Sequence, residues 1–157
     1  MSAEHVRGLE EVDGAGLRIA LVRSSFNEEI TKGLLDGARR VCEKAGAAEI
    51  DEFDVPGSFE LALVAQRLAE SGYDAVVALG AVIEGETDHY DHIATAARDG
   101  LLRVMLDTKV PVGFGVLTVR RTEHARARSG PGPTNKGVEA AEAAIRTARM
   151  LADLAAR

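Results

Sequence analysis

Apolar and polar residues follow two different periods along this chain, and the pattern predicts strands separated by helices. Short apolar runs that are typical of buried strands lie at 18–22, 49–55, 76–83 and 111–117. Segments that have apolar residues at helical spacing or begin at a capping residue lie at 25–45, 58–71, 88–102, 122–128 and 136–157. The chain therefore alternates strand and helix, with short connections between them.

This alternation predicts one α/β domain in which helices cover both faces of a four-stranded parallel sheet. Crossovers between parallel strands are right-handed, and this rule favours a three-layer sandwich with the flavodoxin-like strand order 2-1-3-4. The domain is expected to span residues 17–157. Residues 1–16 show no packing pattern, so we expect either a frayed arm or a segment that docks on a neighbouring subunit.

Capping residues and glycines set the expected limits of the helices. The side chains that can cap four of them are Ser25 with Glu28, Ser58, Thr87 or Asp88, and Thr134 or Asn135. Gly46 and Gly72 are expected to end the first two helices, and Gly100 to weaken the end of the third. The only cysteine, Cys42, lies on the apolar face of the first helix, which indicates a core residue; a reactive thiol is the less favoured alternative.

The third strand and the turn after it are the centre of the predicted site. The apolar run at 76–83 is unbroken, as in a central strand that is buried on both faces. The chain then turns at Gly85 and enters a helix that carries His89 in its first turn. Because open α/β sheets bind ligands beyond the carboxyl ends of their strands, we expect the ligand at this turn.

Aromatic residues are scarce, and Phe26, Phe59 and Phe114 lie in or just after predicted strands. Each can be an ordinary core residue. Their shared position at strand ends favours a flat ligand that stacks on their rings.

Three interpretations of His89 remain open from the residues alone. It can be a surface histidine, or a general acid and base, because imidazole exchanges protons near neutral pH. It can also join His92, Asp88 or Asp91 in binding a metal. Metal binding ranks last, since a histidine pair three residues apart is a common pattern and no thiol lies nearby.

The turn Gly85-Glu86-Thr87 can hold a phosphate through backbone N–H groups and the threonine hydroxyl. The acidic side chains of Glu86 and Asp88 oppose an anion there, so a phosphate needs cations from elsewhere. Arg128 and Lys136, on either side of a Gly/Pro-rich link, are candidates.

Composition excludes several classes of protein. The 157 residues carry a formal net charge of −6, which makes nucleic acid an unexpected partner. No apolar run approaches the roughly 20 residues that a membrane-spanning helix needs, and no signal-peptide core precedes the first strand. One cysteine fits a reducing compartment, so we expect a soluble cytoplasmic protein. The chain has no P-loop, dinucleotide fingerprint or nucleophile elbow, which leaves an acid–base site for a small, partly aromatic ligand.

Taken together, the motifs resemble the 6,7-dimethyl-8-ribityllumazine synthase family over about residues 17–150. The segments that carry the resemblance are 24–27 (Ser-Ser-Phe-Asn), 55–60 (Val-Pro-Gly-Ser-Phe-Glu), 80–83 (Gly-Ala-Val-Ile), 85–89 (Gly-Glu-Thr-Asp-His), 114–118 (Phe-Gly-Val-Leu-Thr) and 135–137 (Asn-Lys-Gly). The resemblance implies condensation of 5-amino-6-(D-ribitylamino)uracil with 3,4-dihydroxy-2-butanone 4-phosphate, a step of riboflavin biosynthesis that needs no metal or other cofactor. A non-catalytic flavin or lumazine binder and an archaeal-type riboflavin synthase are the alternatives.

The resemblance also assigns roles to individual residues. It implies proton transfer by His89 and stacking of the pyrimidine on Phe26. The residues that it places around the two substrates are Asn27, Ser58, Phe59, Glu60, Ala81, Val82, Ile83, Glu86 and Thr87. Phe114, Arg128 and Lys136 match positions that the adjacent subunit supplies in the family, with Arg128 facing the phosphate.

Assembly follows from the same resemblance. Family members form pentameric rings, and some build decamers or shells of 60 copies that can host riboflavin synthase. The link from Arg128 to Lys136 is compact, which favours a shell, although Pro131 and Pro133 can set an angle that forbids it. One departure is Glu84, where the family often has Arg; it changes the charge beside the phosphate turn.

Overall fold

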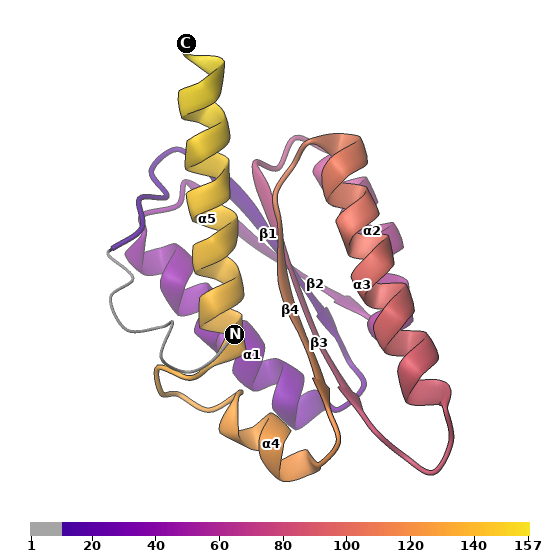
Figure 1. Ribbon diagram of the computed structural model, residues 1–157. Coiled ribbons are helices and arrows are strands. Elements are labelled where there is room, and N and C mark those ends of the chain that lie inside the picture. Colours follow the sequence, from indigo (N-terminus) through magenta and orange to yellow (C-terminus); the bar gives the residue numbers. More distant parts are fainter. Residues whose placement is uncertain (1–10) are drawn as a thin grey trace.

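The computed structural model describes residues 11–157 and shows a parallel sheet between two layers of helices (Figure 1). The strands are β1 (Arg18–Ser24), β2 (Glu49–Val55), β3 (Ala75–Ile83) and β4 (Val112–Val119). All pairs are parallel and the order is β2-β1-β3-β4. The predicted sandwich and the strand order 2-1-3-4 are therefore confirmed.

The helices α1 (Glu28–Lys44) and α5 (Lys136–Ala155) cover one face of the sheet, whereas α2 (Leu61–Ala69) and α3 (His89–Thr108) cover the other (Figure 1). The short helix α4 (Thr122–Ala127) follows β4. Alternate side chains of β1 point into the two cores, because successive strand residues face opposite sides. β3 lies inside the sheet and is buried from Ala75 to Val82, which explains its unbroken apolar run.

Two strands extend further than the apolar pattern predicted. β1 continues through Arg23 and Ser24, which pair in register with Asp54 and Val55 of β2. Arg23 is buried, and its guanidinium forms an ion pair with Asp54 at 3.1 Å. Because this residue is polar, a search for apolar runs ends the strand too early. β4 likewise runs past residue 117 to pair with the end of β3.

The expectation that the third helix weakens at Gly100 is wrong, because α3 passes through this position and ends at Thr108. A Cβ at Gly100 would lie 2.8 Å from the Cβ of Ala62 on α2. The glycine therefore serves the close approach of two helices and does not mark a helix end.

The predicted caps have mixed outcomes. Asn135 caps α5, since its side chain accepts hydrogen bonds from the backbone N–H groups of Gly137 and Val138. The Ser25–Glu28 capping box is wrong: α1 begins after Asn27, and no side chain caps it. Ser58 does not cap a helix either, because it lies inside a short 3₁₀ turn, η2 (Ser58–Glu60), that precedes α2. 

At the start of α3, Asp88 makes no capping hydrogen bond, whereas the Thr87 hydroxyl accepts one from the His89 N–H at 3.3 Å.

Residues 11–16 lie against their own chain. Val12 packs on the core, Ala15 forms an antiparallel bridge with Ala47, and the Arg149 side chain donates a hydrogen bond to the Asp13 carbonyl at 2.7 Å. The rest of the predicted arm, residues 1–10, lies outside the described residues, so docking on a neighbouring subunit stays a prediction.

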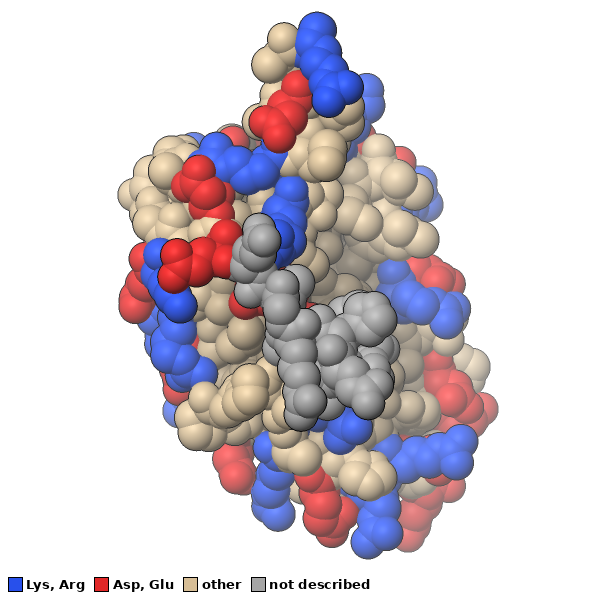
Figure 2. All heavy atoms as spheres, turned by 60° about the vertical axis from the view of Figure 1, so that its left-hand side comes forward, with Lys and Arg blue, Asp and Glu red and all other residues tan. Residues whose placement is uncertain are grey.

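The surface on the α1 side carries charges of both signs. Figure 2 shows Lys and Arg side chains lying among Asp and Glu on the visible part of this face. Within residues 11–157, none of the helices is long and apolar enough to cross a membrane.

Candidate active site

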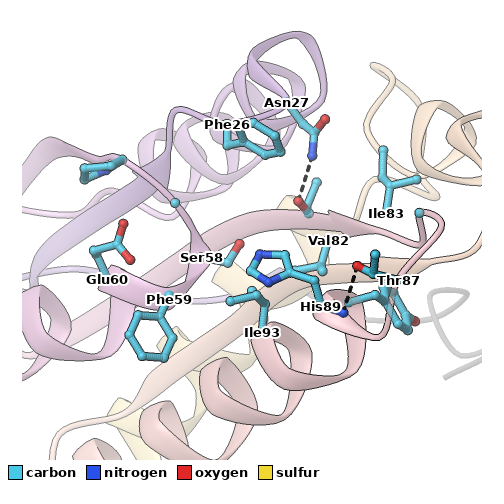
Figure 3. A pocket seen from close by; sticks show the side chains of 15 residues that line it. Phe26, Asn27, Ser58, Phe59, Glu60, Val82, Ile83, Thr87, His89 and Ile93 are labelled. Carbon is cyan, nitrogen blue, oxygen red and sulfur yellow. Dashed lines mark hydrogen bonds between the residues drawn. The ribbon is translucent and has the colours of Figure 1, made fainter.

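A cavity of about 560 Å³ opens beyond the carboxyl ends of β1, β2 and β3, beside the first turns of α3 (Figure 3). It brings together most of the predicted site residues: Phe26, Asn27, Ser58, Phe59, Glu60, Ala81, Val82, Ile83, Thr87 and His89. Tyr90 and Ile93 also line it, although the sequence analysis did not select them. The signal that marks them is their spacing, because Ile93 lies four residues after His89 and three after Tyr90, and both spacings place side chains next to each other on a helix surface.

Asn27 shapes the upper rim of this cavity. Its backbone has φ 60° and ψ 53°, the left-handed conformation that asparagine tolerates better than most residues. Its side-chain Nδ2 donates a hydrogen bond to the Ala81 carbonyl at 2.9 Å, which ties the end of β1 to the end of β3 (Figure 3). The backbone N–H of Phe26 donates to the Pro56 carbonyl at 3.1 Å, and this bond holds the aromatic residue at the rim.

Ser58 lines the cavity and packs closely against Gly80 of β3. Ser58 is buried, and a Cβ at position 80 would lie 2.5 Å from its hydroxyl oxygen. The glycine in the middle of β3 therefore leaves the space that the serine side chain occupies. Phe26 and Phe59, in contrast, are 71% and 63% exposed, so their rings are available for contact with a ligand.

His89 is the first residue of α3, and its ring points into the cavity (Figure 3). His92 makes a different contact: its Nε2 lies 3.3 Å from an Asp88 carboxylate oxygen. Among residues 11–157, no three His, Cys, Asp or Glu side chains converge as a metal site would require. An exposed imidazole beside aromatic rings and short polar side chains is suited to proton transfer on a bound organic ligand.

The predicted cations lie elsewhere. None of the described residues that line the first cavity is Lys or Arg, and Glu60 adds a negative charge. Phe114, Arg128 and Lys136 line a second cavity of about 380 Å³ along β4. Within residues 11–157 no residue lines both cavities, and His89 and Arg128 of one chain therefore line separate sites.

Two acidic residues near the turn lie outside the first cavity. Glu86 is exposed and does not line the cavity, unlike its neighbours Gly85 and Thr87. Glu84 forms an ion pair with Arg120 at 3.5 Å, so the residue that departs from the resemblance interacts with a cation at the end of β4.

The second cavity has its own electrostatic pattern. Lys136 Nζ lies 2.8 Å from a Glu139 carboxylate oxygen, and the Arg128 guanidinium donates a hydrogen bond to the His124 carbonyl at 3.0 Å. Phe114, on the outer side of edge strand β4, is 47% exposed. Two cations and an aromatic ring at one edge are suited to an anionic group on an aromatic or planar ligand.

The fold and the first cavity define an α/β protein with a ligand-sized cavity, lined by an exposed histidine, at the carboxyl edge of a parallel sheet. The family model for 6,7-dimethyl-8-ribityllumazine synthase matches residues 16–152. The 6,7-dimethyl-8-ribityllumazine synthase of Kineococcus radiotolerans is 49% identical over 147 residues, 92% of this chain and 91% of the relative. The protein of that name from Salinibacter ruber is 46% identical over 153 residues, 96% of this chain and 97% of the relative. The one from Thermus thermophilus is 49% identical over 139 residues, 87% of this chain and 88% of the relative. The chain belongs to the 6,7-dimethyl-8-ribityllumazine synthase family, as the motifs indicated.

Proposed function

We propose that the protein condenses 5-amino-6-(D-ribitylamino)uracil with 3,4-dihydroxy-2-butanone 4-phosphate to give 6,7-dimethyl-8-ribityllumazine, phosphate and water. The observation that carries the proposal is the first cavity, in which His89 and two exposed phenylalanine rings lie around the ends of three strands. Family membership over most of the chain supports the same reaction.

The chemistry needs held geometry and proton transfer. The 5-amino group of the pyrimidine attacks the ketone, and water leaves to form an imine. Elimination of phosphate then leaves an enol that tautomerises to a second carbonyl group. The ribitylamino nitrogen attacks this carbonyl, and loss of a second water closes the lumazine ring. His89 would move protons in these steps, because its ring is exposed to the cavity and lies beside the strand ends. The remaining lining residues would orient the two reactants, which lowers the entropic part of the barrier.

The pyrimidine substrate fits the β1 and β2 side of the cavity. Phe26 would stack on its ring, with Phe59 offering a second apolar surface. Ser58 and Glu60 would hydrogen-bond the ring edge and the ribityl hydroxyls, together with backbone groups of residues 81–83. Asn27 would contribute its second amide N–H, since the first is bonded to the Ala81 carbonyl.

The phosphate of the second substrate requires cations that this cavity lacks. The turn at 85–87 would offer backbone N–H groups and the Thr87 hydroxyl, but Glu86 lies beside it. Arg128 and Lys136 of a second copy would supply the positive charge, and Phe114 of that copy would close the site. The complete site would thus lie between two subunits.

This arrangement supports a ring in which each copy places its first cavity against one neighbour and its second cavity against the other. A pentamer is the ring that the family implies. Decamers and 60-copy shells remain further forms of the same ring, with riboflavin synthase as a partner of the shell. The link before α5 is compact, since the Lys136 N–H donates to the Arg128 carbonyl at 2.9 Å. The family's biosynthetic role supports a cytoplasmic location.

The test is the rate of lumazine formation from both substrates at neutral pH, after subtraction of the spontaneous reaction. We expect a protein-dependent rate, and His89→Ala should reduce it by roughly 10²–10⁴-fold without loss of assembly. No rate from folded, assembled protein would refute the proposal. Consumption of lumazine supplied alone would instead identify a riboflavin synthase.

A further inference from the structure

Asn135 joins three segments of the chain beneath the second cavity. Its side chain is 1% exposed, although asparagine is normally a surface residue. Its Nδ2 donates hydrogen bonds to the Gly130 carbonyl at 2.7 Å and to the Gly33 carbonyl at 3.0 Å. Its Oδ1 accepts from the N–H of Gly137 at 2.8 Å and of Val138 at 3.2 Å. One carboxamide therefore links α1, the Gly/Pro-rich link and the start of α5.

The surroundings are built closely around this group. A Cβ at Gly37 of α1 would lie 2.5 Å from Oδ1 of Asn135, so this position has no room for a larger residue. Both N–H groups and the oxygen of the carboxamide are used. A carboxylate of the same size could still cap α5, but it would place an oxygen against two carbonyl groups. Only the amide satisfies the whole set of partners.

This junction determines where the two cations of the second cavity lie. The link between them folds back, so that the Lys136 N–H donates to the Arg128 carbonyl at 2.9 Å. The Thr134 hydroxyl donates to the carbonyl of Ala127, the residue before Arg128, at 3.1 Å. The hydrogen bond from Asn135 Nδ2 to the Gly130 carbonyl fixes the same link two residues after Arg128.

We propose that Asn135 is a positioning residue for the phosphate-bearing substrate, acting through Arg128. Its carboxamide fixes the link on α1 and thereby sets the direction in which the Arg128 guanidinium enters the site shared by two copies. This inference rests on the proposed function, because it assigns the phosphate to Arg128. It adds a residue that contacts no substrate and lines neither cavity.

Two substitutions separate the capping contacts from the carbonyl contacts. Asn135→Asp keeps the size and the cap but turns the donors into an acceptor; Asn135→Ser keeps a capping hydroxyl that is too short to reach both carbonyls. In steady-state assays each should raise KM for butanone phosphate by roughly 10-fold, the value of one charge-assisted contact. KM for the ribitylaminopyrimidine should change far less. Thr147→Ala is the matched control, because it removes a side-chain hydrogen bond on the exposed face of α5.

A double-mutant cycle with Arg128→Ala decides between positioning and a general structural role. If Asn135 acts through Arg128, Asn135→Asp should add little to the KM increase that Arg128→Ala already causes. An equal increase in both backgrounds would overturn the inference, as would unchanged KM values or loss of assembly in both Asn135 variants. These outcomes differ from failure of the proposed function, in which the wild-type protein itself forms no lumazine.

Discussion

The left-handed backbone at Asn27 makes an unusual prediction about stability. Alanine normally stabilises a chain relative to glycine, because glycine loses more conformational freedom on folding. At φ 60° the order should reverse. Asn27→Gly loses the hydrogen bond to the Ala81 carbonyl, about 1 kcal/mol, and has no Cβ that opposes this conformation. Asn27→Ala loses the same bond and keeps a Cβ in the left-handed region without the short polar side chain that lets asparagine adopt it, which costs about 1–2 kcal/mol more.

These terms sum to about 2–3 kcal/mol of lost unfolding free energy for the alanine variant. For a domain of this size the midpoint of thermal unfolding should fall by roughly 4–12 °C in Asn27→Ala, and by roughly 2–4 °C in Asn27→Gly. Urea and thermal unfolding at one fixed protein concentration measure the difference, since assembly makes stability depend on concentration. If Asn27→Gly were the less stable variant, the argument from backbone strain would be refuted.

Three further predictions concern sharing of the site, a partly buried carboxylate and the thiol. If sites form between copies, His89→Ala and Arg128→Ala subunits that are unfolded and reassembled together in equal amounts should recover about a quarter of wild-type activity. Random assembly gives that share of sites an intact His89 from one copy and an intact Arg128 from the next. No recovery in mixed assemblies would contradict sharing. Burial raises the pKa of Glu142, helped by Glu139 and opposed by Arg146 and Lys44, and one of its carboxylate oxygens is buried without a hydrogen-bond partner among the described residues. The fold therefore disfavours the charged form of this carboxylate, so Glu142→Gln should raise the midpoint of thermal unfolding at neutral pH. This increase in the midpoint should shrink as pH falls toward the ordinary glutamate pKa. An increase that does not depend on pH would argue against this cause. Burial also raises the pKa of the Cys42 thiol to about 12. A thiol reagent should therefore label the protein unfolded in urea and leave the native protein unmodified over the same minutes. Rapid labelling of the native protein would show that the thiolate is accessible.

The sequence predicted those parts of the fold that depend on local pattern. β3 and its strand neighbours follow from apolar runs, and Asn135 was correctly one of two candidate caps because the N-cap preference is local. The predicted ends of β1, near Arg23, and of α3, near Gly100, were wrong for the opposite reason. A buried ion pair with Asp54 and a close approach of α3 to Ala62 are tertiary contacts, and they override the local signal that a polar residue or a glycine gives.

The site shows the same division. Ten predicted residues line one cavity because they lie at or just after the carboxyl ends of neighbouring strands of a parallel sheet. The separation of Arg128 from His89 was expected only through resemblance, since spacing along the chain does not fix how far the link before α5 lies from the first turn of α3. Asn27 was selected as a substrate ligand, whereas its hydrogen bond to Ala81 became visible only in three dimensions.

Helix α5 also separates the chemistry from the end of the chain. It begins at Lys136 beside the second cavity and, at 1.5 Å per residue, carries the last residues about 30 Å away. Residues 151–157 are all exposed, and this end of the helix projects beyond the rest of the surface in Figure 2. A fusion partner, affinity tag or immobilising linker attached after Arg157 would therefore stand at the far end of the subunit from both cavities, which makes this terminus the natural point for coupling the protein to a support.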